Sequence, residues 1–257
     1  MLANHAPVVV FSHCFTCNKD LKSTVRISRA LAKLGVTVLR YDMRGLGGSS
    51  GRFDESNFST NLADLAAATQ FADRELGTVT GLVGHSFGGF ASLVTAAGAT
   101  QELRPKISAL GFVATLAAPS ETQHLADLLL RMNPAIERDG RGEVVIGGIR
   151  WSITLQMIED FRRHHFSDQL NQIQCPALVL HSPVDATVGY DHALRLMTLI
   201  QSSRKEPTRI NPVSLVSLPG SDHLLAGNPA DVQFVSELLA TWSHRYAGNN
   251  AEPKDGS

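Results

Sequence analysis

The chain has 257 residues and a mass of 27.7 kDa, and its 23 lysines and arginines against 24 aspartates and glutamates give a formal net charge of −1. Nucleic acids and anionic membrane surfaces are held mainly by clustered positive charge, so this balance argues against either as an obligatory partner. With 43% hydrophobic and 18% charged residues, the composition is that of an ordinary globular protein, long enough for one large α/β domain or two small ones.

The sequence carries no sign of membrane insertion or secretion. No run approaches the roughly 18 to 20 apolar residues of a membrane-spanning helix, and residues 1–5 lack the basic-then-apolar layout of a secretion signal. Cys14, Cys17 and Cys175 are too few and too unevenly placed for a disulfide framework, so we expect a cytoplasmic protein in a reducing compartment. The Cys14-x-x-Cys17 spacing matches redox and zinc sites, but no second pair completes a metal shell, and a redox or metal role is the minor interpretation.

Short β-rich apolar runs alternate with stretches of helical spacing along most of the chain. The expected strands are 8–11, 36–41, 79–83, 107–113, 177–181 and 214–218, and the expected helices between them include 24–34, 61–76 and 87–99. Strands buried on both faces read as continuous apolar runs, and their alternation with helices indicates a mostly parallel sheet with crossover helices. The predicted fold class is therefore α/β.

One segment interrupts the alternation. It contains an amphipathic stretch, a glycine-flanked apolar run and a second helical stretch, at 121–132, 143–149 and 153–163. Roughly fifty residues are far more than the usual connection of about 2 to 6, so we expect a small cap over the strand ends. The polar last residues cannot offset the entropy of ordering them. The predicted division is a core of 1–117 and 171–247, a cap insertion of 118–170 and a disordered tail of 248–257.

The strongest local signal is the sequence Gly84-His85-Ser86-Phe87-Gly88. It directly follows an expected strand and directly precedes a helical stretch, which is the context of a nucleophile elbow. The flanking glycines allow the strand and the helix to approach closely. Ser86 is therefore the candidate nucleophile.

A second match to G-x-S-x-G lies at 47–51, with Ser49 at its centre. It sits in a loop of glycines and polar residues with no strand entering directly and no helix leaving. A serine there has no rigid turn to aim its hydroxyl at a base. We assign this loop to chain reversal.

A serine hydroxyl needs a base and a group that orients the base. His223 follows the last expected strand, and Asp185 follows the strand before it. The order Ser86, Asp185, His223 is that of the α/β-hydrolases rather than of chymotrypsin or subtilisin. Asp222 is the alternative acid, but adjacent residues rarely turn their side chains toward each other.

Other histidines receive structural assignments. His85 is expected to be packed into the elbow, while His164 and His165 are expected to be exposed in the cap. The oxyanion formed during acyl transfer needs fixed donors, usually two backbone N–H groups. One is expected from Phe87, and the other from the loop after the first strand, residues 12–16.

These residues resemble the α/β-hydrolases, in particular small bacterial esterase-like members, over the chain up to Tyr246. The resemblance rests on the triad, on the loop His13-Cys14-Phe15-Thr16-Cys17-Asn18-Lys19 and on Asp42-Met43-Arg44-Gly45-Leu46-Gly47-Gly48-Ser49. It implies that the backbone N–H of Phe15 is the second oxyanion donor, although Cys14 replaces the usual glycine. Asp42 and Arg44 are interpreted as a structural pair or as turn formers. Family members usually begin with a hairpin before the strand at 8–11, so the sheet should have about six strands here, or an amino-terminal piece is missing.

The sequence resembles in particular hydrolase domains fused to a following OsmC-type domain, which share the Cys-Phe-Thr-Cys loop and a stretch like Ala118-Pro119-Ser120. The prediction is a serine hydrolase that cleaves a small carboxylic ester through an acyl-enzyme, without metal or organic cofactor. The open alternatives are an acyltransferase or peptidase with the same triad, and a non-catalytic binding domain, with an OsmC-type protein as a possible partner. The expected pocket residues are His13, Leu128, Met132, Trp151 and Met157.

Overall fold

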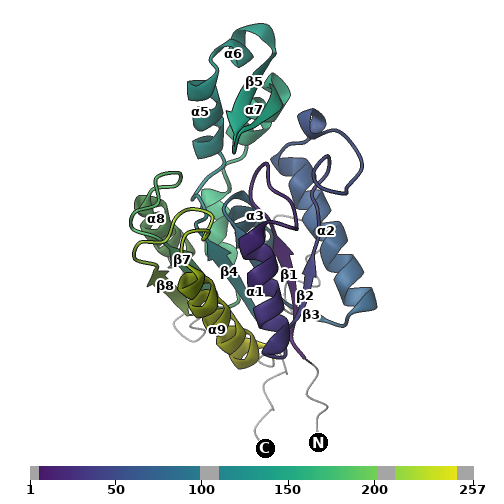
Figure 1. Ribbon diagram of the computed structural model, residues 1–257, viewed down its shortest axis with the longest axis vertical. Coiled ribbons are helices and arrows are strands. Elements are labelled where there is room, and N and C mark those ends of the chain that lie inside the picture. The colour runs from purple at the N-terminus through teal and green to yellow at the C-terminus, as the bar shows by residue number, and fades with distance from the viewer. Residues whose placement is uncertain (1–5, 99–109, 202–211, 248–257) are drawn as a thin grey trace, which may run out of the picture.

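The computed structural model describes residues 6–98, 110–201 and 212–247. Its centre is a six-stranded sheet in the order β2-β1-β3-β4-β7-β8, with every neighbouring pair parallel (Figure 1). The strands are β1 (Val8–Ser12), β2 (Thr37–Arg40), β3 (Val79–His85), β4 (Phe112–Leu116), β7 (Ala177–His181) and β8 (Val213–Ser217). The predicted α/β class and the count of about six strands are confirmed.

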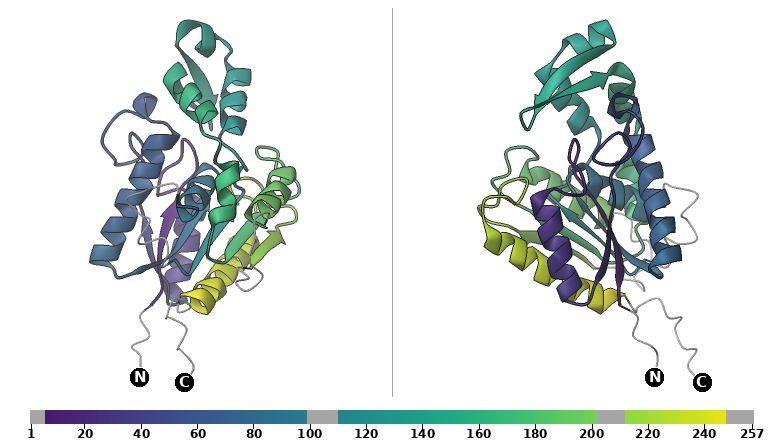
Figure 2. Two further views of the ribbon diagram at one scale, coloured as in Figure 1. Left: turned by 180° about the vertical axis from the view of Figure 1, so that it is seen from behind. Right: turned by 45° about the vertical axis from the view of Figure 1, so that its right-hand side comes forward.

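Helices cover both faces of this sheet (Figure 2). In β1, Val8 and Val10 join one buried apolar cluster, whereas Val9 and Phe11 join the other. The first cluster includes side chains of α2 (Phe58–Glu75), α3 (Phe87–Ala96) and α8 (Tyr190–Gln201), and the second includes those of α1 (Lys22–Lys33) and α9 (Pro229–Tyr246). Because successive strand residues point to opposite faces, burial on both sides requires an unbroken apolar run.

The boundaries of some elements differ from the predicted ones. Helix α2 begins at Phe58 rather than at residue 61, because Asn57 and Thr60 form a reciprocal cap: the Thr60 N–H donates to Asn57 Oδ1 over 2.8 Å and the Asn57 N–H donates to Thr60 Oγ1 over 2.9 Å. The strand expected at 107–113 is β4, which begins at Phe112; residues 107–109 lie outside the described part. Helix α3 ends at Ala96, and the predicted end at 99 also lies outside it.

Most of the residues between β4 and β7 gather above one end of the sheet (Figure 1), and residues 118–170 are called here the cap segment. They form α5 (Gln123–Met132), α6 (Ala135–Asp139), the antiparallel hairpin of β5 (Arg141–Ile146) and β6 (Ile149–Thr154), α7 (Leu155–Arg163) and most of the 3₁₀ helix η3 (Phe166–Gln172), which packs on α8 and α3. The apolar run expected at 143–149 is thus most of β5 and the hairpin turn, where Gly147 and Gly148 have φ of 60° and 78°. The tail expected at 248–257 lies outside the described residues.

A buried carboxylate ties the cap segment to α2. Asp160, on α7, accepts hydrogen bonds from the backbone N–H and the hydroxyl of Ser59 over 3.1 and 2.7 Å, and it pairs with Arg163 over 2.8 Å. A buried charge persists where it is paired and hydrogen-bonded, so this junction fixes how the cap segment sits on the sheet. No helix within the described ranges is long and apolar enough to cross a membrane.

Candidate active site

The turn from β3 into α3 holds Ser86 in an unusual backbone conformation, with φ of 52° and ψ of −120°. The Ser86 N–H donates to the carbonyl of Leu116 on the neighbouring strand over 2.7 Å, which fixes the turn. A Cβ on Gly84 would lie 2.2 Å from the Gly88 oxygen, and a Cβ on Gly88 would lie 2.4 Å from the His13 oxygen. The close approach of the backbone segments therefore requires both glycines. The turn is a strained elbow that presents the Ser86 hydroxyl at the carboxyl ends of the strands.

Three loops at the carboxyl ends of the strands bring Ser86, His223 and Asp185 together. His223 Nε2 lies 3.0 Å from Ser86 Oγ, and His223 Nδ1 lies 2.7 Å from Asp185 Oδ2. Asp185 follows β7 and His223 lies in the loop after β8, so parallel strand ends bring together residues far apart in sequence. An imidazole held between a hydroxyl and a carboxylate can accept the hydroxyl proton and remain oriented while charged.

The neighbouring Asp222 does not take the place of Asp185. Its carboxylate accepts hydrogen bonds from the backbone N–H groups of Leu224, Ala226 and Gly227, and so shapes the loop that carries His223. The carboxylate hydrogen-bonded to the imidazole is that of Asp185.

Asp185 is 7% exposed and its environment favours the charged form. Burial by itself raises the pKa of this carboxyl, but hydrogen bonds from His223 and from the N–H groups of Val188 and Thr187 outweigh it, and the pKa lies below its ordinary value. The group is thus an anion at neutral pH, which suits it to stabilise a positive charge on the imidazole.

His85 is hydrogen-bonded to the loop that carries His223. Its Nε2–H donates to the backbone carbonyl of His223 over 2.6 Å. Burial, together with the nearby His223, lowers the pKa of His85 to about 3, so its ring is neutral at physiological pH. The sequence predicts that His85 packs into the elbow but not that it contacts His223, because the two residues are 138 positions apart and only the strand order joins them.

This neutral histidine predicts acid sensitivity. Below pH 6.5 the unfolded chain binds a proton at His85 that the folded chain does not bind until about pH 3, so the free energy of unfolding falls as pH decreases through that window. His85→Gln keeps an N–H donor but does not titrate. Urea unfolding at pH 7, 6 and 5 should therefore show a smaller decrease in unfolding free energy for the variant than for wild type, and equal decreases would contradict the assignment.

The loop after β1 lies beside Ser86. Phe15 packs its ring against Phe87 at 5.6 Å and against Phe161 of the cap segment at 6.0 Å between ring centroids. Phe87 is the first residue of α3, where backbone N–H groups have no partner within the helix. The loop and the start of the helix therefore lie side by side, and the oxyanion donors expected from Phe15 and Phe87 stay a prediction.

Cys14 and Cys17 form a disulfide in this loop, a bond that the sequence analysis did not expect. Their Cα atoms lie 5.3 Å apart across a tight turn, within the range that a disulfide spans. Three cysteines are too few for a framework of several disulfides, but two of them three positions apart can still form a local bond of this kind. Cys175 is free and buried.

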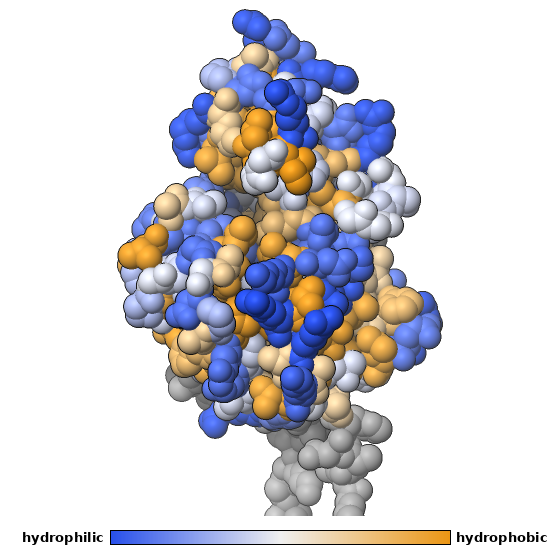
Figure 3. Space-filling view, in the orientation of Figure 1, coloured by the Kyte–Doolittle hydropathy of each residue, from blue (hydrophilic) through white to orange (hydrophobic). Residues whose placement is uncertain are grey.

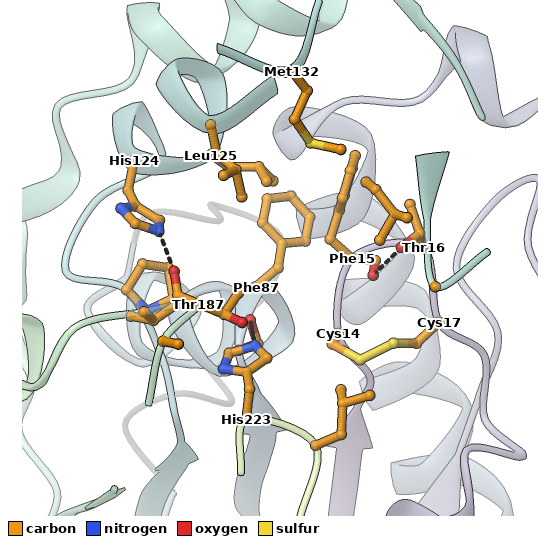
Figure 4. A pocket seen from close by; sticks show the side chains of 18 of the residues that line it. Cys14, Phe15, Thr16, Cys17, Phe87, His124, Leu125, Met132, Thr187 and His223 are labelled. Carbon is orange, nitrogen blue, oxygen red and sulfur yellow. Dashed lines mark hydrogen bonds between the residues drawn. A yellow bond between two sulfur atoms is a disulfide. The ribbon is translucent and has the colours of Figure 1, made fainter. Parts of the chain in front are cut away.

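A cavity of about 750 Å³ opens above Ser86 between this loop and the cap segment (Figure 4). Its lining is mostly apolar and includes Phe15, Phe87, Leu125, Leu128, Met132, Val145, Ile146, Ile149 and Val188, with Arg131 and His124 among the polar residues. Figure 3 shows apolar residues on the lower part of the upper lobe and around the narrowing beneath it, whereas the top of the lobe is hydrophilic. The cavity thus suits an uncharged, largely apolar molecule.

Of the expected pocket residues, Leu128 and Met132 line this cavity, whereas His13, Trp151 and Met157 do not. His13 is fully buried, donates from Nδ1 to the Cys14 carbonyl over 2.8 Å and accepts from the Met43 N–H at Nε2, so it supports the loop from behind. Met157 is fully buried in the apolar cluster that also contains side chains of α2 and α3, and Trp151 packs on Phe53 at 4.7 Å between ring centroids. Helical and strand periodicity identified apolar residues without showing which of them face the cavity.

Two further sequence assignments concern the polar loops. Asp42 pairs with Lys19 over 2.8 Å rather than with Arg44, and it accepts the Gly48 N–H, so it is a structural anchor. The Ser49 hydroxyl donates to the Asp42 carbonyl over 2.6 Å in an exposed turn, which confirms chain reversal there. Among the residues described by the structure, no cluster of three His, Cys, Asp or Glu side chains could hold a metal ion.

Comparison with known proteins places this arrangement in a family. The Alpha/beta hydrolase family model matches residues 9–233, and a search of curated proteins found no match. The crystal structure of the esterase domain of a Rhodothermus marinus protein is 35% identical over 96% of this chain and 90% of that chain, with a TM-score of 0.68.

Two more distant structures share the fold. Est1E from Butyrivibrio proteoclasticus, with ferulic acid bound, is 20% identical over 93% of this chain and 89% of that chain, with a TM-score of 0.69. A putative hydrolase from Agrobacterium vitis is 22% identical over 92% and 88%, with a TM-score of 0.74. Because the family match spans most of the sequence and the esterase domain aligns over nearly its whole length, this chain belongs to the alpha/beta hydrolase family.

Proposed function

We propose that this protein is a serine esterase that hydrolyses a small carboxylic ester through an acyl-enzyme on Ser86. The observation that carries the proposal is the continuous hydrogen-bonded series from Ser86 through His223 to Asp185, at 3.0 and 2.7 Å. All three residue types needed for nucleophilic acyl transfer are in hydrogen-bonding distance without rearrangement.

In the first half of the reaction, Ser86 Oγ attacks the ester carbonyl carbon while His223 Nε2 takes the hydroxyl proton. Asp185 stabilises the resulting imidazolium through Nδ1–H. The carbonyl oxygen becomes an oxyanion, which accepts hydrogen bonds from the backbone N–H groups of Phe15 and Phe87. Collapse of this intermediate breaks the ester C–O bond, and the alcohol leaves with the proton from His223.

In the second half, His223 removes a proton from water as the water oxygen attacks the acyl carbon. The tetrahedral intermediate uses the same two N–H groups, and its collapse returns the proton to Ser86 Oγ and releases the carboxylic acid. Each proton moves between groups already within hydrogen-bonding reach, so no metal or cofactor is needed for the steps.

The cavity supports an ester with an apolar portion. Leu125, Leu128 and Met132 from α5 face Phe15 and Phe87 across it, as the close-up of the pocket shows for the labelled residues (Figure 4). Burying each methylene there contributes about 0.8 kcal/mol, so we expect kcat/KM to rise from acetate to medium-chain esters.

The test is hydrolysis of p-nitrophenyl acetate, butyrate and octanoate by the purified protein. Release of p-nitrophenolate that increases with chain length supports the proposal, whereas no release from any of the three contradicts it. If added alcohol raises the rate of p-nitrophenolate release and the ester of that alcohol is formed, the acyltransferase alternative is favoured over hydrolysis. Association with an OsmC-type protein and a cytoplasmic location stay predictions.

A further inference from the structure

The disulfide closes the turn that carries Phe15. The Cys17 N–H donates to the Cys14 carbonyl over 3.2 Å, so residues 14–17 form a β-turn with Phe15 and Thr16 at its centre. Thr16 has φ of +58°, in the left-handed region. A β-branched residue is seldom found there, because its side chain crowds the backbone. The turn therefore has a conformation that its own sequence does not favour.

Other contacts hold the two ends of the loop. At one end, His13 fixes the Cys14 carbonyl. At the other, the Lys19 N–H donates to Asp42 Oδ1 over 2.7 Å and the Lys19 ammonium pairs with the same carboxylate. Within the turn, the disulfide is the covalent link across the strained residue, and Figure 4 shows it directly beside Phe15 and Thr16.

We infer that the Cys14–Cys17 disulfide is a positioning element for the oxyanion donor on Phe15, so that ester hydrolysis depends on whether these two cysteines are oxidised. The inference rests on the proposed function. A shift of about 1 Å at a positioned catalytic group can cost on the order of 100-fold in rate, so a modest relaxation of this turn is sufficient to slow the reaction.

Both cysteines line the cavity, so a small reductant that enters it can reach the bond. A dithiol such as dithiothreitol supplies two electrons and two protons: its thiolate attacks one sulfur, the Cys14–Cys17 bond breaks, and the mixed disulfide resolves to give two protein thiols and the cyclic oxidised reagent. Thr16 can then move toward negative φ and carry the neighbouring peptide groups with it. Because the oxyanion exists in the transition state and not in the bound ester, the loss should fall on kcat rather than on KM.

The experiment first counts thiols. Denatured, unreduced wild type should titrate one thiol, from Cys175, and reduced wild type three. Steady-state hydrolysis of p-nitrophenyl butyrate then compares oxidised wild type, wild type reduced with dithiothreitol, and Cys17→Ser. We expect kcat about tenfold lower in the last two, with KM changed less than twofold and no further effect of dithiothreitol on Cys17→Ser. Cys175→Ala is the matched control, which keeps the wild-type response to the reductant.

A rescue variant separates positioning from general stability. Glycine adopts φ of +58° without a Cβ penalty, so Thr16→Gly introduced into Cys17→Ser should recover part of the lost kcat. Hydrogen exchange of a peptide covering residues 12–20 should rise on reduction while that of β3 does not. Three thiols in the unreduced protein, or oxidised and reduced enzyme with the same kcat, would overturn the inference and leave the proposed function standing. An oxidised enzyme that hydrolyses no ester would instead defeat the proposed function.

Discussion

Replacing Ser86 by alanine is expected to lower kcat for p-nitrophenyl butyrate by about 10⁴-fold or more, since among the described residues Ser86 provides the hydroxyl that is held against His223 Nε2 to form the acyl-enzyme. The residual rate should come from the oxyanion donors and from binding alone. KM should change little, because the hydroxyl occupies a small part of a cavity of about 750 Å³. The measurement is initial-rate kinetics with enough enzyme to detect a rate close to the background.

Ser49→Ala is the matched control for this experiment. Ser49 lies at the centre of the other G-x-S-x-G sequence, in an exposed turn, and its hydroxyl contacts the Asp42 carbonyl rather than a base. Its kcat should remain within about twofold of wild type. Comparable losses in the two variants, or an Ser86→Ala enzyme with wild-type activity, would show that the reaction does not use the elbow.

The second large effect is expected at Asp185. Asp185→Asn should lower kcat by about 10⁴-fold, because an amide can present an N–H to His223 Nδ1 and so favour the tautomer that cannot accept the serine proton. The variant should fold, because its amide oxygen can still accept the N–H groups of Thr187 and Val188. Kinetics combined with thermal unfolding separates the loss of activity from any loss of stability.

Asp222→Asn provides the comparison that decides which carboxylate orients the imidazole. It keeps an oxygen for the N–H groups of Leu224 and Ala226, and we expect kcat to fall by less than about tenfold. If Asp222→Asn were the more damaging of the two, the assignment of Asp185 as the orienting acid would be wrong.

The fold and the candidate site were largely predictable because both depend on local patterns. Strands buried on both faces leave continuous apolar runs, which located five of the six strands of the sheet to within two residues at each end, whereas β4 lies at Phe112–Leu116 and 107–113 was expected. The elbow sequence at Ser86 combines a residue pattern with a strand before it and a helix after it. Since parallel strands end at the same edge, the loops of Asp185 and His223 could be expected near it.

What could not be predicted depends on contacts between distant segments. The bond from His85 to the His223 carbonyl follows from the order of the strands in the sheet, which apolar runs do not encode. The burial of Met157 and the packing of Trp151 depend on how α7 and β6 fold against α2 and η1 (Phe53–Glu55). The disulfide is a local exception: it spans one turn in which Thr16 has φ of +58°, and a threonine gives no sign of that left-handed conformation.

The most direct test of the central claim is to trap the covalent intermediate. The enzyme is mixed with excess p-nitrophenyl butyrate, quenched in acid within the first turnovers, digested and analysed by peptide mass spectrometry. The account predicts one butyryl group on the peptide that contains Ser86 in wild type, and none on the corresponding peptide of Ser86→Ala. If Asp185→Asn slows deacylation as well as acylation, the fraction of that variant carrying the butyryl group should be larger than its low turnover rate alone would suggest. Active enzyme that carries no acyl group at Ser86, or that carries it on another residue, would contradict the account.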